Sequence, residues 1–299
     1  MKRMKRMKKD RGSTILVFIF FIGLSVVLYP FISDYWNSRT QSRAIATYSD
    51  TVAQMDETDY EALLEEANEY NRELLDLSFP FVEYESLGKY EKILDISGTG
   101  IMGYVTIPIL GVELPIYHGT DEGVLQVAAG HLSGSSFPVG GVGTHAVISA
   151  HRGLPSAKLF SDLDEMMEGD IFTITVLNQT IAYEVDQIRI VLPEEVEELQ
   201  IDADKDYCTL MTCTPYGINS HRLLVRGIRT DAPGLTTAYV PADATQINST
   251  VVSIALAIPM VFILLIILLI DQRRVDKKSK KKPAAEEAVE RIKTEGIEK

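Results

Sequence analysis

Residues 207–229 read Tyr-Cys-Thr-Leu-Met-Thr-Cys-Thr-Pro-Tyr-Gly-Ile-Asn-Ser-His-Arg-Leu-Leu-Val-Arg-Gly-Ile-Arg and contain two strand-like runs joined by a turn. The first run alternates small or β-branched residues with apolar ones and stops at Cys213-Thr-Pro-Tyr-Gly, which is typical of a turn. It predicts a strand that ends at Cys213, where a thiol is accessible. Because side chains alternate along a strand, the second run places Arg222 and Arg226 on one face.

A cysteine and an arginine at the same end of a sheet suit covalent acyl chemistry. The cation favours the thiolate and can later stabilise an oxyanion. The competing interpretation is that Cys213 is a small buried hydrophobic residue and that the arginines are solvated strand charges. Residues 207–229 alone do not separate the two interpretations, nor do they choose between Arg222 and Arg226.

The chain has only two cysteines, Cys208 and Cys213, and they do not suit a disulfide. Along an extended strand their Cα atoms are about 16 Å apart, far beyond the limit of about 7 Å for a disulfide. Their odd spacing also points the side chains to opposite faces. If Cys208 faces the core, Cys213 faces the other way.

Two uncharged runs, each of about 20 residues, are long enough to cross a bilayer; they are Thr14–Ile32 and Val251–Ile270. We interpret the first as an uncleaved signal anchor, because its apolar run exceeds that of a typical signal peptide and Ser33-Asp-Tyr-Trp offers no small-residue cleavage site. Basic clusters within residues 2–11 and 273–282 flank the two runs. By the positive-inside rule both termini are cytoplasmic, and residues 33–250 lie outside the cell.

The expected external region is strongly acidic. The tails 1–12 and 271–299 hold 17 of the 29 Lys and Arg residues and 8 of the 42 Asp and Glu residues, which leaves 12 basic and 34 acidic residues between them, a formal net charge of −22. Such a domain repels nucleic acid and favours a basic or lysine-bearing partner, although solubility alone also explains acidity.

Residues 34–77 predict one or two helices, with an apolar stripe at Leu63, Leu64, Ala67, Tyr70 and Leu74. Phe79-Pro80-Phe81 then breaks the helical pattern. From about Ile101 onward, short strand-like runs separated by turns predict a sheet that closes into a barrel with small helical excursions. The expected strands are Gly103–Ile107, Val112–Ile116, Val124–Ala128, His145–Ala150, Ile171–Val176, Ile181–Val191, Tyr207–Cys213 and Arg222–Ile228, and the expected helices are Ala157–Glu168 and Pro193–Gln200.

A nucleophilic cysteine needs a proton acceptor, and the chain offers His118, His131, His145, His151 and His221. His151 is the best candidate, because it ends a strand-like run before a Gly-Leu-Pro loop and is therefore placed like Cys213; His131 lies in a Gly/Ser-rich loop and remains an alternative. No zinc, serine-triad or nucleotide-binding motif is present. We expect neither a metal nor a cofactor.

Three segments resemble the sortases, and in their extended form the class C, pilus-assembling members of that family. They are Thr209-Leu-Met-Thr-Cys213-Thr-Pro-Tyr-Gly-Ile-Asn-Ser-His-Arg222-Leu-Leu-Val-Arg-Gly, Gly143-Thr-His-Ala-Val-Ile-Ser-Ala-His151-Arg-Gly-Leu-Pro-Ser-Ala-Lys-Leu-Phe and Ile101-Met-Gly-Tyr-Val-Thr-Ile-Pro. The resemblance implies a closed, eight-stranded β-barrel with short helices, preceded by a helical segment and flanked by two transmembrane helices. It also implies a cysteine transpeptidase on the outer face of a Gram-positive membrane.

By that resemblance, Cys213 attacks an LPXTG-like sorting signal of a pilin and forms a thioester, and His151 serves as general acid and base. Arg222 orients the substrate and stabilises the oxyanion, and Thr212 supports the site. The partners implied are pilins with an acceptor lysine and the lipid bilayer, with no nucleic acid. The alternatives are a sortase that attaches proteins to the cell-wall peptide, a catalytically silent assembly scaffold, and a hydrolytic cysteine protease.

Class C sortases commonly carry an Asp-Pro-aromatic lid that covers the cysteine, and here the matching residues are Phe79, Pro80 and Phe81, without the acid. We expect Phe81 to cap Cys213 through apolar contact, without an ionic latch. The expected organisation is a cytoplasmic tail (1–12), a signal anchor (13–32), an extracellular helical segment (33–100) with the lid at about 76–86, the catalytic barrel (101–232), a linker (233–250), a transmembrane helix (251–270) and a cytoplasmic tail (271–299).

Overall fold

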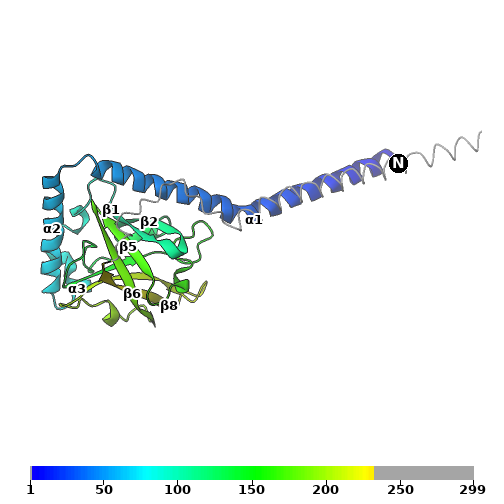
Figure 1. Ribbon diagram of the computed structural model, residues 1–299. Coiled ribbons are helices and arrows are strands. Elements are labelled where there is room, and N and C mark those ends of the chain that lie inside the picture. The colour runs from blue at the N-terminus through cyan, green and yellow to red at the C-terminus, as the bar shows by residue number, and fades with distance from the viewer. Residues whose placement is uncertain (1, 232–299) are drawn as a thin grey trace, which may run out of the picture. The chain divides into compact units, whose positions relative to one another are not determined.

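The computed structural model describes residues 2–231, with side chains from residue 18 onward (Figure 1). The expected second transmembrane helix, the linker before it and the C-terminal tail lie outside the described residues. The described chain begins with three helices, namely α1 (Lys2–Val52), α2 (Glu57–Leu75) and α3 (Pro80–Glu83). They are followed by the short 3₁₀ turns η1 (Tyr84–Leu87) and η2 (Tyr90–Lys92).

Eight strands then form a closed barrel in the order β1-β2-β3-β4-β7-β8-β6-β5. Their bounds are β1 (Ile101–Ile107), β2 (Val112–His118), β3 (Ala129–His131), β4 (Thr144–Ser149), β5 (Ile171–Val176), β6 (Gln179–Val191), β7 (Asp206–Thr214) and β8 (His221–Thr230). The short helix α4 (Glu122–Leu125) and the 3₁₀ turns η3 (Pro108–Leu110), η4 (Leu163–Glu165) and η5 (Glu197–Leu199) lie between strands. The predicted closed barrel with small helical excursions is confirmed.

Two of the neighbouring strand pairs are parallel, and one of them shapes the site. β4 runs parallel to β7, with Thr144 opposite Asp206 and Ser149 opposite Met211. β2 and β3 are also parallel, whereas β7 and β8 form an antiparallel pair. The carboxyl ends of β4 and β7 therefore meet at one end of the barrel, where β8 begins.

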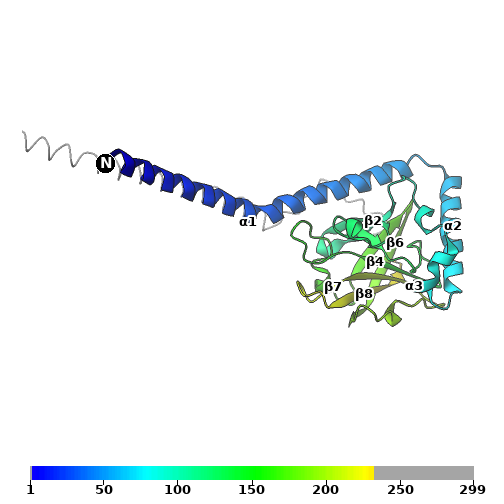
Figure 2. The same ribbon diagram turned by 180° about the vertical axis from the view of Figure 1, so that it is seen from behind.

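The predicted helical segment is confirmed as α1 and α2, whose apolar stripes pack against the barrel (Figures 1 and 2). Asp56 caps α2 by accepting a hydrogen bond of 3.0 Å from the backbone N–H of Asp59. Buried Asn71 on α2 bonds both backbone groups of Phe137, at 2.7 and 3.1 Å. This paired contact ties α2 to the loop before β4.

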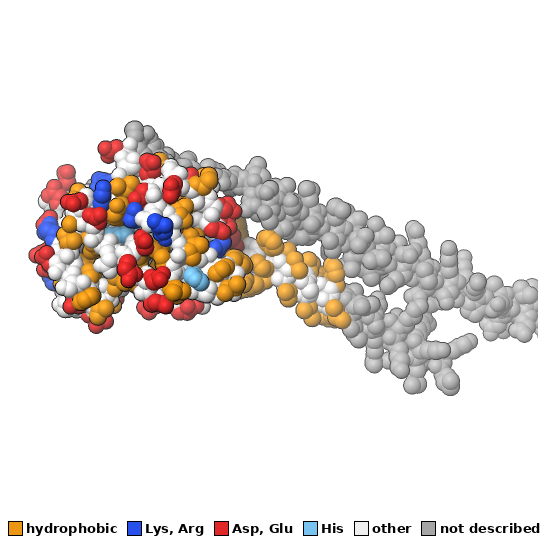
Figure 3. Space-filling model, turned by 90° about the horizontal axis from the view of Figure 1, so that it is seen from below, with side chains coloured by type: hydrophobic (Ala, Val, Ile, Leu, Met, Phe, Trp, Pro, Cys, Tyr) orange, Lys and Arg blue, Asp and Glu red, His pale blue; other side chains and the backbone are white. Residues whose placement is uncertain are grey.

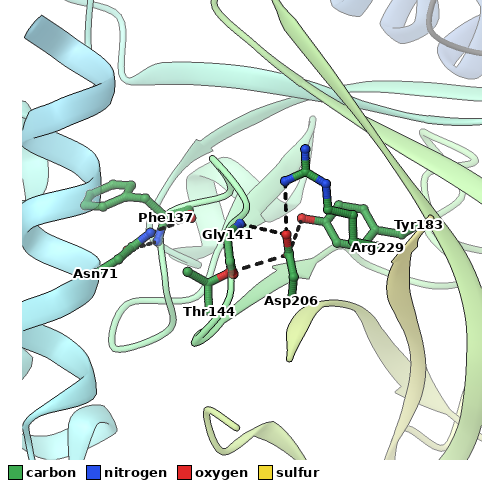
Figure 4. Close-up of polar contacts among 7 residues, drawn as sticks. All are labelled: Asn71, Phe137, Gly141, Thr144, Tyr183, Asp206 and Arg229. Atoms are coloured by element: carbon green, nitrogen blue, oxygen red, sulfur yellow. Dashed lines mark hydrogen bonds and ion pairs between the residues drawn. The ribbon is translucent and has the colours of Figure 1, made fainter. Parts of the chain in front are cut away.

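At the beginning of β7, the buried carboxylate of Asp206 joins three parts of the barrel (Figure 4). It accepts hydrogen bonds from the backbone N–H of Gly141 at 2.6 Å, from the Tyr183 hydroxyl at 3.1 Å and from Arg229 at 3.2 Å. A buried carboxylate is tolerated only when its oxygens are satisfied in this way. This end of β7 is therefore structural.

Three predicted elements are wrong. In the expected helix at residues 193–200 only the three-residue 3₁₀ turn η5 forms. Residues 124–128 do not form a strand, because the chain turns there through hydrogen bonds from Val124 and Ala128 to the carbonyls of Asp121 and Val124, and pairing begins only at Ala129. Residues 157–168 do not form a long helix, because Leu159 has a positive φ of 42° and only η4 is helical. The apolar residues that suggested the helix, Leu159, Phe160, Leu163 and Met166, are nevertheless buried in the core.

Candidate active site

The two faces of β7 separate its cysteines. Cys208, Leu210 and Thr212 are buried, whereas Met211 and Cys213 on the opposite face are partly exposed. Both thiols are free. Burial, with a smaller contribution from the Asp206 carboxylate, raises the pKa of the Cys208 thiol well above its ordinary value. Cys208 is thus a core residue, and Cys213 is the thiol that a substrate can reach.

Arg222 lies directly across from Cys213 in the antiparallel β7–β8 pair. Its guanidinium donates to the backbone carbonyls of His221 and Asn219, at 3.2 and 3.4 Å, and pairs with no carboxylate among residues 18–231. Arg226, by contrast, is bonded to both carboxylate oxygens of Asp186 at 3.1 and 2.7 Å. The register and these contacts therefore distinguish the two arginines that the sequence pattern left open.

His151 reaches the same place from β4. The parallel register pairs Ser149 with Met211, and the next contact is a hydrogen bond of 3.1 Å from the Ala150 N–H to the Met211 carbonyl. His151 and Cys213 each lie two residues beyond the paired Ser149 and Met211, and we therefore expect them at the same level. Buried Thr212 donates a hydrogen bond of 2.8 Å to the Ala150 carbonyl and so fixes the backbone just before His151.

The remaining histidines have other partners. His145 lies between the Gln200 carbonyl and the Thr209 hydroxyl, at 2.9 and 2.7 Å, and His131 lies between Tyr90 and the Ser136 carbonyl. Burial lowers the pKa of both imidazoles to about 4. His118 contacts the carbonyls of Gly100 and Ile93, and His221 contacts Ser220 at the surface. None of these contacts directs an imidazole toward Cys213.

The segment Phe79-Pro80-Phe81 lies beside the β4, β7 and β8 part of the barrel, where Figure 2 shows α3. Phe81 packs on an apolar cluster around Val147, Leu224 and Met211, the last of which shares a face with Cys213. The backbone of Phe81 lies very close to Gly134. A Cβ atom added to Gly134 would lie only 2.7 Å from the Cα atom of Phe81. Phe79 is exposed and forms no part of this cluster.

Two further side chains, which sequence reasoning did not identify, border the site. The Glu122 carboxylate on α4 lies 3.6 Å from His151 Nε2. Buried Arg152 pairs with Asp164, donates to the Thr214 hydroxyl at 3.4 Å and lies over the Tyr216 ring. It thereby joins the loop after His151 to the loop between β7 and β8. Neither contact has a local sequence signal, because the partners lie on separate loops.

The surface around the barrel is acidic, and Figure 3 shows carboxylates to be more widespread than basic side chains on the face seen there. Among the described residues no group of three or more His, Cys, Asp or Glu side chains is arranged to hold a metal ion. The structure provides a partly exposed thiol on β7, opposite Arg222 on β8, and β7 also pairs with β4, the strand that leads to His151. Such an arrangement can carry out nucleophilic acyl transfer.

Residues 105–230 match a family model described as the Sortase domain. Sortase C1 from Streptococcus agalactiae is 49% identical and superposes with a TM-score of 0.58, covering 64% of this chain and 99% of that one. Sortase C from Streptococcus pneumoniae, which is described together with its pilin substrate specificity, is 47% identical with a TM-score of 0.56, covering 64% and 97%. Sortase A from S. agalactiae serotype III (strain NEM316) is 32% identical over 117 residues, which are 38% of this chain and 47%, about half, of that protein.

Proposed function

Because this chain belongs to the sortase family of cysteine transpeptidases, we propose that it polymerises pilins: it cleaves an LPXTG-like sorting signal and transfers the acyl group to a lysine of another pilin. The observation that carries this proposal is the strand register: Arg222 on β8 lies opposite Cys213, and β4, which pairs with β7 as far as Ser149 and Met211, leads to His151 two residues later. The similarity to class C sortases of streptococci supports the choice of pilins as substrates.

In the first half-reaction, the Cys213 sulfur attacks the threonine carbonyl of the sorting signal. The Thr–Gly amide bond breaks, the glycine amine leaves with a proton from His151, and the acyl carbon stays bound to sulfur as a thioester. The Arg222 guanidinium has no carboxylate partner among the described residues, and so it is available to stabilise the oxyanion and orient the substrate.

In the second half-reaction, the amine of an acceptor lysine attacks the thioester and loses a proton to His151. An isopeptide bond forms, and the thiolate of Cys213 leaves. Thr212 supports the site, because its hydroxyl donates a hydrogen bond to the Ala150 carbonyl and thereby fixes the end of the strand that leads to His151. No metal or cofactor enters either step.

The enzyme acts at the membrane. Within the described residues one helical segment, Phe18–Val52, is long and apolar enough to span a bilayer, with a mean hydropathy of 1.7 in its most apolar window. The same helix continues to Asp34, Asn37 and Gln41, whose side chains bond the barrel loops at Lys158, Ser156 and Val127. We place the barrel outside the cell, both termini in the cytoplasm, and a second span at residues 251–270.

Phe81 acts as a lid over the approach to Cys213. It covers the apolar surface at Met211 and Leu224, and an apolar substrate side chain would need the same surface. The closing contact is apolar, because no carboxylate of the described segment pairs with Arg222. Such a lid opens at a smaller cost than one held by an ion pair.

The proposal is tested by incubating the full-length protein in detergent with a sorting-signal peptide and one of two acceptors, a pilin that presents lysine or a wall-peptide amine. We expect the pilin to be joined to the peptide through its lysine. Transfer to the wall-peptide amine alone would identify a wall-anchoring sortase instead. Release of free acid despite excess amine would indicate a protease, and absence of cleavage a scaffold.

A further inference from the structure

The short helix α4 carries a carboxylate, that of Glu122, which lies beside the imidazole of His151. Glu122 Oε2 lies 3.6 Å from His151 Nε2, which is within ion-pair distance. The Glu122 side chain is 72% exposed, whereas that of His151 is only 25% exposed. The more exposed carboxylate therefore lies on the solvent side of the imidazole.

Glu122 is oriented by its own helix. Its second oxygen, Oε1, accepts a hydrogen bond of 2.9 Å from Gln126 Nε2. The chain just after α4 is held by α1, because Gln41 donates a bond of 2.7 Å to the Val127 carbonyl. Asn37 on α1 likewise donates a hydrogen bond of 2.7 Å to the Ser156 carbonyl, which lies in the loop that follows His151. One helix thus fixes both segments that carry the pair.

The contact distinguishes the two ring nitrogens of His151. Nε2 faces Glu122, and in the described part of the chain Nδ1 has no hydrogen-bond partner. A carboxylate on one nitrogen of an imidazole keeps the proton there and leaves the other nitrogen to exchange protons with a substrate. With Nε2 protonated, Nδ1 is the nitrogen available to the leaving amine and to the attacking lysine.

The charged and titratable groups around His151 come from four elements. α4 contributes Glu122, β7 contributes the Cys213 thiol, β8 contributes Arg222, and the loop of His151 contributes Arg152, whose charge is paired with Asp164. The hydrogen bond from Gln126 and, after it, the charge of His151 lower the pKa of Glu122. Glu122 is therefore ionised at neutral pH.

We propose that Glu122 is a positioning residue that fixes the ring orientation of His151 and holds it protonated at Nε2, so that Nδ1 delivers and accepts the proton during transpeptidation. This role rests on the proposed function, since it acts through the acid and base of that reaction. It extends the Cys213, His151 and Arg222 arrangement by a fourth group. That group lies on the short helix α4, just before the residues 124–128 that the sequence pattern had suggested to be a strand.

The test compares Glu122→Gln with Glu65→Gln in the full-length protein. Glu65 is a matched control because it is an exposed glutamate that pairs with Arg72 on α2, away from the site. Glutamine keeps a hydrogen-bond acceptor near Nε2 but removes the charge. We expect kcat/KM of Glu122→Gln to fall about threefold to fivefold, because the proton on Nε2 is no longer held there, whereas Glu65→Gln should stay within about twofold of the unaltered protein.

Two further measurements separate orientation from charge. Glu122→Ala, which removes the acceptor as well, should lower kcat further. The ring-nitrogen resonances of His151, assigned with His151→Ala, should show the proton on Nε2 in Glu65→Gln and a mixture of both tautomers in Glu122→Gln. Equal kcat/KM and identical ring-nitrogen resonances for these two variants would overturn the role of Glu122.

The proposed function fails in a different and recognisable way. If the unaltered protein and Cys213→Ala give equal amounts of cleaved peptide, the transpeptidase itself is refuted. If only the Glu122 variants lack an effect while the unaltered protein is active, the positioning role alone is refuted. Thermal unfolding of each variant checks that an activity change does not come from a loss of folded protein.

Discussion

Cys208 and Cys213 lie on the same strand, yet they occupy opposite chemical environments. Cys208 is fully buried in the barrel core, and burial raises the pKa of its thiol. Cys213 is partly exposed on the other face, opposite Arg222. Side chains alternate between the two faces of a strand, so the odd spacing of the two cysteines is enough to make one a core side chain and the other a candidate nucleophile.

The two ends of β7 also differ in whether their polar side chains have bonding partners. At its start, the Asp206 carboxylate is satisfied by several donors, as Figure 4 shows. At its end, Arg222 has only backbone carbonyls as partners among the residues described, and Cys213 has no hydrogen-bond partner there. Polar groups without strong partners are available to a ligand, and we infer that the open end of β7 is the reactive one.

Replacing each cysteine in turn tests this difference most strongly. Cys213→Ala should lower transpeptidation by at least about a thousandfold, because the acyl acceptor is lost. Cys208→Ala should retain activity while the free energy of unfolding falls by about 1–2 kcal/mol, because a small buried side chain is truncated. Product formation and urea unfolding measure the two effects. Equal activity of the two variants would contradict the assignment of Cys213.

Two threonines of β7 allow a smaller test of the same kind. Thr212→Val removes the hydrogen bond to the Ala150 carbonyl and should reduce kcat about fivefold to tenfold, because a bond of about 1 kcal/mol no longer holds the strand end before His151. Thr209→Val removes the bond to His145 and should lower thermal stability with little effect on kcat. If both variants lost the same activity, Thr212 would have no special relation to the site.

The smallest expected effect concerns the lid. Phe81→Ala should increase the rate of thiol labelling at Cys213 about threefold, because an apolar contact of this size costs little to open. Val82→Ala, in the same short helix but exposed, should leave the rate unchanged. Between pH 7 and pH 9 the folded protein should show no labelling of Cys208, since the raised pKa keeps its thiol protonated. An unchanged rate at Cys213 in Phe81→Ala would exclude Phe81 as a lid.

The sequence predicted most strands because alternation of apolar residues is a local property. It failed where local pattern and tertiary role differ. Residues 124–128 are apolar enough for a strand, but α4 and its turn position them, and the apolar residues of 157–168 serve the core without helix formation. In residues 157–168 burial, and not regular backbone pairing, explains the apolar pattern, whereas in residues 124–128 only Ala128 is buried and Val127 is exposed.

The residues of the candidate site likewise divide into those that the sequence predicted and those that it did not. Cys213 and Arg222 belong to consecutive strands, so a turn between them was enough to predict that they lie close together. The sequence likewise pointed to the strand end at His151 and, by resemblance, to Thr212. Glu122, Arg152 and Tyr216 carried no signal, because their contacts cross between loops that are adjacent only in the folded protein.

By itself the sequence determined that the chain closes into a barrel, that Cys208 and Cys213 point apart, and that an apolar segment precedes the barrel. These properties depend on neighbouring residues, whose spacing sets side-chain direction and hydrophobicity. Only the tertiary structure decided that Arg226 pairs with Asp186, how β4 and β7 pair in parallel, and which carboxylate meets His151. Those contacts join residues distant in the chain, and their geometry follows from register and packing, which no local pattern specifies.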